Sequence, residues 1–200
     1  KKNKINLRSV KVLDLASGSG KNSIPVSEIG FDLYCVDYSK PGLNYTKKRL
    51  KKLKLGGNFF CIDFVENPLP FPNDFFDAII SIQVFDHIFL KSFSRVLQET
   101  SRVLKPKGEM IASIMGNKTS KKNRRGTLIK NNKNSCIVST GNSAGEIHTF
   151  YDLNKIKKLF EKNYKIDQAA LVSTLFENTK EFAKKGDRIE CEYFSLLNKL

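Results

Sequence analysis

Residues 12–20 read V-L-D-L-A-S-G-S-G, and this stretch decides the fold. The apolar residues around Asp14 predict a buried strand over residues 11–16, and the glycines that follow at once predict a tight turn. Residues 22–29 then favour a short helix, with Pro25 in the first turn, where its missing N–H costs little. Such a turn lets the backbone approach a ligand, and the start of the helix offers free N–H groups.

Two further acids follow the next two predicted strands. Asp37 comes directly after a strand at residues 31–36, and Asp63 directly after one at residues 59–62. Ligands of open parallel sheets bind at the edge where the strands end, so Asp14, Asp37 and Asp63 are expected to meet there. At that edge Asp37 can accept hydrogen bonds from ribose hydroxyls, and Asp63 can accept one from an adenine amino group.

The glycine loop departs from two other nucleotide-binding patterns. A Walker A loop requires Ser or Thr where this chain has Asn22, and an earlier glycine where it has Leu15. The dinucleotide fingerprint requires a third glycine where the chain has Ser23. The remaining pattern is the acid-led loop D-x-G-x-G-x-G of S-adenosylmethionine (SAM) binding, with Ala16 at the first glycine.

Strands and helices continue to alternate along the chain. Further helices are expected at residues 41–53, 93–104 and 153–160, and further strands at 77–82, 109–115, 166–175 and 188–196. Because residues 177–187 are too few for a crossover helix, the last two strands are expected to pair antiparallel. The sequence therefore predicts one α/β domain over residues 1–200, a doubly wound Rossmann-like sheet of seven strands, mostly parallel with the last strand antiparallel.

Four ordered motifs resemble the class I SAM-dependent methyltransferases, in particular their large type 11-like group. They are V-L-D-L-A-S-G-S-G, F-D-L-Y-C-V-D-Y-S, L-P-F-P-N-D-F-F-D-A-I-I-S-I-Q-V-F-D-H-I and R-V-L-K-P-K-G-E-M. The resemblance covers residues 12–115 well and residues 148–160 weakly. It implies a SAM-dependent methyltransferase and does not specify the methyl acceptor.

The resemblance also implies which residues hold SAM. The backbone of the loop would contact the methionine part, Asp37 the ribose, Tyr38 the adenine face, and Asp63 with the Phe64 backbone the adenine edge. Ser81 and Ile82, at the end of the fourth predicted strand, would border the methionine end. The cofactor-binding set is Asp14, Ala16, Gly18, Gly20, Asp37, Tyr38, Asp63, Phe64, Ser81 and Ile82. Ala16 replaces the usual glycine, which narrows the conformational freedom of the turn.

Both histidines of the chain map to the same edge, which makes them the candidate catalytic residues. His87 follows the fourth strand beside the expected methyl group, and His148 precedes the last predicted helix together with Tyr151. Either ring could act as a general base for an acceptor that carries a proton. Each histidine could equally serve only in packing or capping.

The cysteines predict neither a zinc site nor a secreted protein. The four are Cys35, Cys61, Cys136 and Cys191; none is spaced as C-x-x-C, and both histidines are far from them along the chain, so no metal is expected. Reduced cysteines in apolar runs suit the cytoplasm. No apolar run approaches the ~20 residues of a membrane helix, and the N-terminus lacks the apolar region of a secretory signal.

The charge leaves the class of acceptor open. The formal net charge is +15, which favours anionic partners. Residues 117–145 are polar and basic and are expected to form a mobile flap beside the acceptor. The leading hypothesis is an anionic or neutral small-molecule acceptor. One alternative is RNA, because S-I-Q-V-F-D-H-I is also similar to tRNA wobble-uridine methyltransferases, and the other is a non-catalytic SAM-fold partner subunit. The three acids argue against the last.

Overall fold

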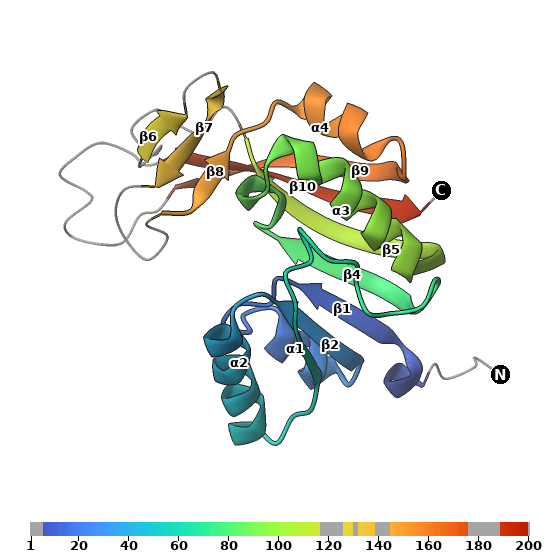
Figure 1. Cartoon of the computed structure of the whole chain (residues 1–200). Coiled ribbons are helices and arrows are strands. Elements are labelled where there is room, and N and C mark those ends of the chain that lie inside the picture. The colour runs from blue at the N-terminus through green and yellow to red at the C-terminus, as the bar shows by residue number, and fades with distance from the viewer. Residues whose placement is uncertain (1–5, 117–125, 130–131, 139–144, 176–188, 200) are drawn as a thin grey trace.

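The structure is a computed structural model that describes residues 6–116, 126–129, 132–138, 145–175 and 189–199, of which 126, 128, 132–134, 167–175 and 189–196 are described by backbone alone. Seven strands form the main sheet: β1 Lys11–Leu15, β2 Asp32–Asp37, β3 Asn58–Cys61, β4 Phe76–Ile82, β5 Leu104–Met115, β9 Tyr164–Leu175 and β10 Ile189–Lys199. Their order is β3-β2-β1-β4-β5-β10-β9 (Figure 1).

The directions of the strands confirm the predicted sheet. Strands β1 to β5 pair in parallel, whereas β10 is antiparallel to both β5 and β9. One boundary differs from expectation, because β5 begins at Leu104, whereas the strand was expected from residue 109 and the residues before it were expected to form a turn. There the ladder with β4 shifts register and Lys107 adopts a φ of 64°, so the expected turn is a bulge inside a longer strand.

Four helices connect and cover these strands. They are α1 Ser23–Ile29, α2 Lys40–Lys52, α3 Leu90–Val103 and α4 Leu153–Phe160. Capping groups fix several ends: Ser39 accepts from the Gly42 N–H at the start of α2, Asp152 accepts from the Lys155 N–H at the start of α4, and Gly30 ends α1 with a φ of 98°. None of the helices among the described residues is long and apolar enough to cross a membrane.

The helices lie in two layers, one on each face of the sheet (Figure 1). Val12 of β1 packs with Val26 of α1 and Leu43 of α2. The next residue, Leu13, points to the opposite face and joins the core that contains Val96 of α3. This alternation follows from the two-residue period of a strand, and it leaves the ends of the strands as the edge between the two helical layers.

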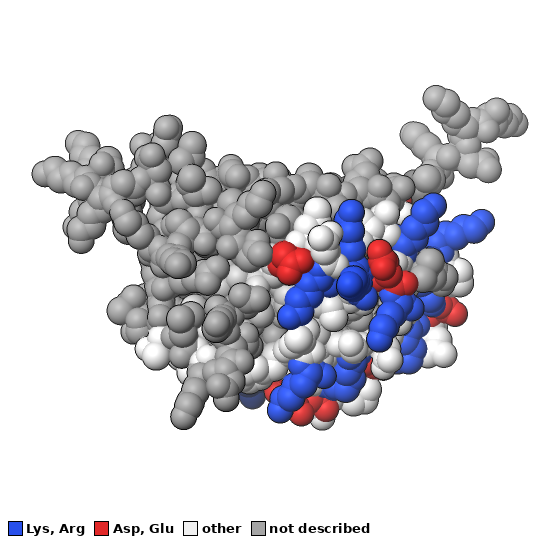
Figure 2. Space-filling view, turned by 90° about the horizontal axis from the view of Figure 1, so that it is seen from above, with Lys and Arg blue, Asp and Glu red and all other residues white. Residues whose placement is uncertain are grey.

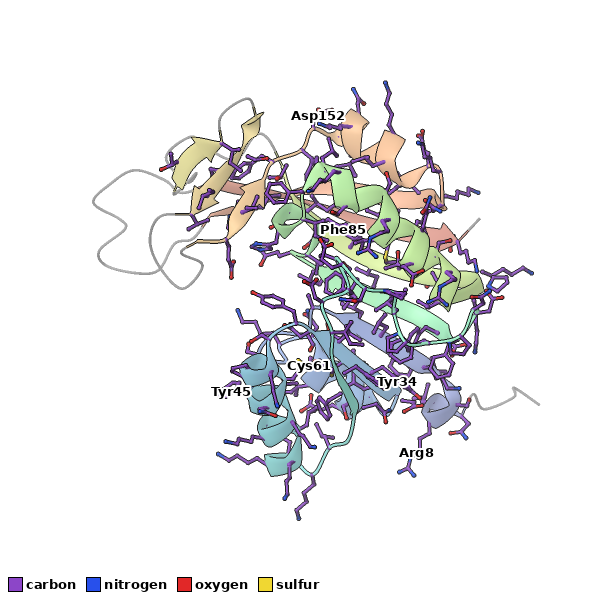
Figure 3. All side chains as sticks on the ribbon, viewed as in Figure 1. Arg8, Tyr34, Tyr45, Cys61, Phe85 and Asp152 are labelled. Carbon is purple, nitrogen blue, oxygen red and sulfur yellow. The ribbon has the colours of Figure 1, made fainter. Side chains whose placement is uncertain are left out.

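Aromatic rings hold the segment that follows β4 against the helices of the second layer. Phe85 begins the short 3₁₀ turn Phe85–His87 and lies beside α3 (Figure 3). Its fully buried ring lies 4.7 Å from that of Phe93 and 5.5 Å from that of Phe160, between centroids. Tyr151 contacts the same cluster at 5.6 Å from Phe93. The position of His87 is therefore set by core packing.

A second, small sheet corrects the expectation of an irregular segment at residues 117–145. Strands β6 Gly126–Ile129 and β7 Asn132–Val138 pair antiparallel, and β7 pairs in turn with β8 Ile147–Thr149. Cys136 and Val138 are buried while Ile137 between them is exposed, which is strand alternation that the surrounding Asn and Lys residues conceal. Residues 117–125, 130–131 and 139–144 lie outside the described part, so the predicted mobility of the flap stays a prediction there.

Candidate functional site

The turn after β1 adopts the conformation that its glycines were expected to permit. Ala16, Gly18 and Gly20 all have positive φ, at 57°, 50° and 78°. A Cβ built on Gly20 would stand 2.6 Å from Cγ2 of Thr46, so a side chain at this position would collide with α2. Ala16 adopts the left-handed conformation at the position where the motif prefers glycine, at a cost of about 1–2 kcal/mol.

Two side chains of helix α2 hold this turn by donating hydrogen bonds to carbonyl oxygens of the turn. The Thr46 hydroxyl donates to the Gly18 carbonyl at 2.8 Å, and the Arg49 guanidinium donates to the Ser19 carbonyl at 2.7 Å. Within the turn, the Gly20 N–H donates to the Ser17 carbonyl at 2.8 Å. The loop backbone is thus fixed from one side by α2.

The carboxylate of Asp37 ties the same loop to the end of β2. One oxygen accepts from the Gly18 N–H at 2.7 Å and the other from the Ser39 N–H at 2.8 Å. The side chain is 4% exposed. Each carboxylate oxygen has a second lone pair, so these bonds leave acceptor capacity for a ligand hydroxyl.

Asp14 lies fully buried beneath the loop. One carboxyl oxygen accepts from the Ser23 hydroxyl at 2.5 Å, and the other has no hydrogen-bond partner among the described residues. Burial, with a smaller contribution from the charge of Asp37, raises the pKa of Asp14 from 3.8 to about 6, against the opposing hydrogen bond from Ser23. The acid at the start of the motif is therefore held near the middle of its titration at weakly acidic pH.

The residues expected around an adenine ring lie beyond the ends of β2 and β3. Tyr38 follows Asp37 with 67% of its surface exposed, and Asp63 is exposed two residues after β3. Asp63 accepts from the Val65 N–H at 3.0 Å, which orders the following turn, and Phe64 is buried. An exposed ring and an exposed carboxylate are the features that the expected roles require, and those roles stay predictions.

Two buried hydroxyls lie near the carboxyl edge of the sheet, one in the glycine loop and one near the end of β4. Ser17 and Ser81 are both buried, and neither hydroxyl has a hydrogen-bond partner among the described residues. Ser81 is on β4, next to the half-buried Ile82. Buried polar atoms are normally paired, so these oxygens mark a place where a polar ligand would complete the structure.

The turn after β4 brings both histidines together. The rings of His87 and His148 are perpendicular, with centroids 4.6 Å apart. His87 Nδ1 lies 3.4 Å from Oε2 of Glu146, and His87 Nε2 lies 3.5 Å from Oδ2 of the fully buried Asp86. One ligand atom each from His87, Glu146 and His148 lie within 4.8 Å of one another, and we call these three residues the His–Glu–His cluster.

Burial shapes the acid–base properties of this region. Burial, together with the nearby ring of His87, lowers the pKa of His148 to about 4, against the opposing charge of Glu146. His148 is therefore neutral at neutral pH, and it is a weak base. Burial, reinforced by the charge of Asp86, raises the pKa of Tyr151. Only a neutral imidazole can accept a proton, but one with a pKa of about 4 holds that proton weakly, so this pKa does not favour His148 as a general base.

Comparison with known proteins assigns the chain to a family. A family model described as a methyltransferase domain matches residues 13–112, which is half of the chain. The chain belongs to this methyltransferase family. The resemblance to the class I SAM-dependent methyltransferases is thereby confirmed, and with it the transfer of methyl groups from SAM as the chemistry of the class.

Individual relatives of the methyltransferase domain differ in their acceptors. A ubiquinone biosynthesis O-methyltransferase of Pelagibacter ubique is 30% identical over 117 residues, covering 58% of this chain and 45% of that protein. A tRNA N(3)-cytidine methyltransferase of Gallus gallus is 25% identical over 118 residues, covering 54% of this chain and 31% of that protein. The chain spans 25–45% of the length of the first curated relatives that it matches.

A solved structure shows that the methyltransferase fold extends beyond the matched residues. A SAM-dependent methyltransferase from Methanosarcina mazei has a TM-score of 0.79 at 18% identity, covering 96% of this chain and 93% of that one. At this identity the likeness establishes the fold. It includes the small sheet and α4 in the same architecture as the glycine loop.

Sequence reasoning about the methyltransferase domain missed one member of the site. Glu146 was not anticipated, because it follows a segment interpreted as irregular. The available signal was the spacing E-x-H at Glu146 and His148, since residues two apart in an extended segment share one face. The expectation of no metal rested on the spacing of cysteines and histidines along the chain, whereas the fold brings together Glu146 and His87, which are 59 positions apart.

Proposed function

We propose that the chain binds SAM at the carboxyl edge of the sheet and transfers its methyl group to a small-molecule acceptor. SAM supplies an electrophilic methyl group on a sulfonium sulfur. The observation that carries the proposal is the pair of buried, unpartnered hydroxyls of Ser17 and Ser81, which lie beside a glycine loop already fixed by Asp37 and α2. A polar ligand there would satisfy atoms that the protein leaves without partners.

Each part of the edge then has its own binding role. The backbone of Ala16, Gly18 and Gly20 contacts the methionine part, and the spare lone pairs of Asp37 accept from the ribose hydroxyls. The exposed ring of Tyr38 lies against the adenine, and Asp63 with the Phe64 backbone contacts its edge. Ser81 and Ile82 border the methionine end, where a buried hydroxyl can donate to a carboxylate.

The remaining residues position the acceptor. Alignment of acceptor, methyl group and sulfur can supply roughly 7–11 kcal/mol of the barrier, so the protein needs mainly a rigid frame. The Phe85–His87 turn and β8 provide this rigid frame, because a buried phenylalanine lies two residues from each histidine: Phe85 before His87, and Phe150 after His148. His87 and His148 are proposed to contact the acceptor at this place.

RNA is the second candidate acceptor. It is favoured by the net charge of +15 and by the similarity to a tRNA methyltransferase. On the face seen in Figure 2, however, lysine and arginine side chains alternate with acidic ones over the described surface. A continuous basic track is what a phosphate backbone selects, so the small-molecule acceptor stays the first proposal.

The deciding experiment measures SAM binding and methyl transfer separately. Calorimetry should detect one SAM per chain, and tritiated methyl groups from SAM should enter the metabolite fraction of a cell extract rather than its RNA. Tritium found in RNA alone would show that the acceptor is RNA rather than a small molecule. Failure to bind SAM in a folded chain would overturn the proposal as a whole and would favour a partner-subunit role.

The cytoplasm is the proposed location of this activity. Cys35, Cys61 and Cys136 form no disulfide among the described residues, and Cys61 is exposed. Free exposed thiols persist in a reducing compartment. Recovery of the protein in the soluble fraction, with all thiols titratable under denaturing but non-reducing conditions, would support this location.

A further inference from the structure

We propose that the His–Glu–His cluster binds one divalent transition-metal ion of the zinc type, with Asp86 orienting His87. The proposal goes beyond methyl transfer and does not depend on SAM. The first observation is that the chain has two histidines and that both lie in one cluster with a glutamate. They come from two segments, the turn after β4 and the strand β8, which pack against each other.

The distances within the cluster fit a shared ion better than direct hydrogen bonds. Nδ1 of His87 and Oε2 of Glu146 are 3.4 Å apart, and Nδ1 has no hydrogen-bond partner among the described residues. A hydrogen bond between nitrogen and oxygen is normally 2.7–3.2 Å long. Two atoms bound at about 2.0–2.1 Å to one tetrahedral ion stand about 3.4 Å apart.

His148 supplies the third ligand. Its Nε2 atom is buried and has no hydrogen-bond partner among the described residues, although its ring meets that of His87 edge to face. An imidazole nitrogen that is withdrawn from water and unpaired is costly unless something binds it. With the three ligand atoms within 4.8 Å of one another, small side-chain rotations bring them around one ion.

Asp86 provides the outer support that metal-binding histidines usually have. Its carboxylate is fully buried and faces Nε2 of His87 at 3.5 Å, on the side of the ring away from Glu146. This contact is longer than a hydrogen bond, so the ring rotation that brings Nδ1 to the ion also has to bring Nε2 closer to Asp86. A carboxylate behind a ligating histidine fixes its ring orientation and tautomer and raises its basicity. It also gives the site a second negative charge, so a doubly charged cation neutralises Glu146 and Asp86 together.

The backbone around the cluster is rigid enough to hold an ion. His148 pairs with Cys136 in the small sheet, and the buried hydroxyls of Ser135 and Thr149 meet at 2.8 Å directly beside it. His87 is fixed by the buried ring of Phe85. The side chains of His87 and Glu146 are 32% and 40% exposed, which leaves a route for the ion from solvent.

The donor set determines the class of metal. Two imidazole nitrogens and one carboxylate oxygen suit zinc in a site that keeps one position open, whereas magnesium and calcium prefer oxygen ligands alone. Among first-row divalent ions, such a site binds zinc more tightly than iron or manganese. Zn²⁺ is therefore the probe, and Co²⁺ its spectroscopic substitute.

The test uses the full chain without an affinity tag, stripped of metal with a chelator and free of SAM. The two imidazoles give two sets of ¹⁵N signals, and Zn²⁺ should shift both sets to a saturable endpoint at one ion per chain. Co²⁺ should give the intense visible bands of a low-coordinate site. Unmoved imidazole signals at saturating Zn²⁺ would overturn the proposal without the need for any variant.

Variants then locate the ion. His87→Ala, His148→Ala and Glu146→Gln should each weaken Zn²⁺ binding by more than about 100-fold, and Asp86→Asn by about 10–100-fold at unchanged stoichiometry. Glu109→Gln, on the exposed surface of β5, and Cys61→Ser, an exposed thiol, are the matched controls and should bind like the wild type. Binding that survives loss of either histidine but not of Cys61 would assign the ion to the cysteine instead.

SAM affinity of the metal-free chain, measured by calorimetry, separates this proposal from the proposed function. SAM binding without Zn²⁺ binding would remove the metal site and keep the methyltransferase. Zn²⁺ binding without SAM binding would do the reverse.

Discussion

The two halves of the sheet edge differ in how they are held together. On the side of β1 and β2, the loop backbone is fixed by the Asp37 carboxylate, the Thr46 hydroxyl and the Arg49 guanidinium. On the side of β4 and β8, the groups that meet are His87, His148 and Glu146, and their contacts are 3.4 Å or longer. The loop backbone of the first half is held by hydrogen bonds within the protein, whereas the side chains of His87, His148 and Glu146 make no contact of hydrogen-bond length with one another.

The two halves also differ in how far the match to the methyltransferase family extends. We call the half at β1 and β2, which we propose binds SAM, the cofactor side; it lies within residues 13–112, where the family model matches. We call the half at β4 and β8, which we propose contacts the acceptor, the acceptor side; β8 and Glu146 before it lie beyond that match. Changes on the first side should therefore damage folding and SAM binding together, and changes on the second should alter the acceptor or the metal alone.

The largest effect should come from a side chain at Gly20. Gly20→Val combines a positive φ with a Cβ only 2.6 Å from Thr46, so strain and overpacking together should cost several kcal/mol. For a chain of this size about 1 kcal/mol shifts the melting temperature by about 2–4 °C. Thermal unfolding should show a loss of roughly 10 °C or more, with SAM binding abolished.

Gly56→Ala is the matched control, because nothing lies within 4 Å of the added methyl group and its φ is not positive. It should leave the melting temperature nearly unchanged. Equal losses in the two variants would mean that α2 does not hold the loop as described.

The next effect is on stability as a function of pH and concerns Asp14. Its pKa is raised in the folded state, so its contribution to stability is present below 3.8 and lost as the pH rises through about 6. The rise corresponds to roughly 3 kcal/mol for this buried group. Urea unfolding of the wild type relative to Asp14→Asn should show this loss between pH 4 and 7. Parallel stability curves for the two proteins would contradict the assignment.

The cofactor side could be predicted from the sequence because its signals are local. Asp14, Asp37 and Asp63 each stand at or just after a short apolar run, and a strand end fixes where such a residue lies in a parallel sheet. The seven-stranded sheet followed from the same alternation. Even so, the sequence did not indicate that Asp37 would bind the loop amide of Gly18 as well as face a ligand.

The acceptor side could not be predicted because its signals are long-range. Among the described side chains of β7, Cys136 and Val138 are the buried apolar residues, and the strand otherwise consists largely of Asn, Ser and Lys, so local composition indicated a loop. Its pairing with β8 is what carries Glu146 and His148 to the turn after β4. That contact depends on the packing of Phe85 and Tyr151 rather than on any motif.

A smaller effect is expected for Asp37→Ala. The variant loses charge-assisted bonds to the loop and the proposed bonds to the ribose, which contribute about 1.5–3 kcal/mol. SAM affinity measured by calorimetry should fall roughly 10- to 100-fold. Asp32→Ala, at the opposite end of β2, is the control and should bind SAM normally. Unchanged affinity in a folded Asp37→Ala protein would remove Asp37 from the cofactor site.

The smallest effect on the cofactor side should come from the basic residues of the flap. Lys121, Lys122, Arg124 and Arg125 lie outside the described residues, in the segment between Gly116 and the start of β6 at Gly126. Both ends of this segment are on the acceptor side, and exposed charges more than about 8 Å away are largely screened at physiological salt. Neutralising all four should therefore leave SAM affinity nearly unchanged.

The same variant sharpens the comparison between the two acceptor classes. If RNA binds, the logarithm of its affinity should fall with the logarithm of salt concentration at about −0.7 per phosphate contacted on a single strand. Neutralising the four charges would then flatten that slope while methyl transfer to RNA declines. If wild type and variant methylate the metabolite fraction equally and neither responds to salt, the flap does not recruit the acceptor. This result would support the small-molecule proposal, because the positive charge of the flap would then have no role in binding the acceptor. A fall in SAM affinity in the variant would instead show that the flap reaches across to the cofactor side, and the separation of the two halves would fail.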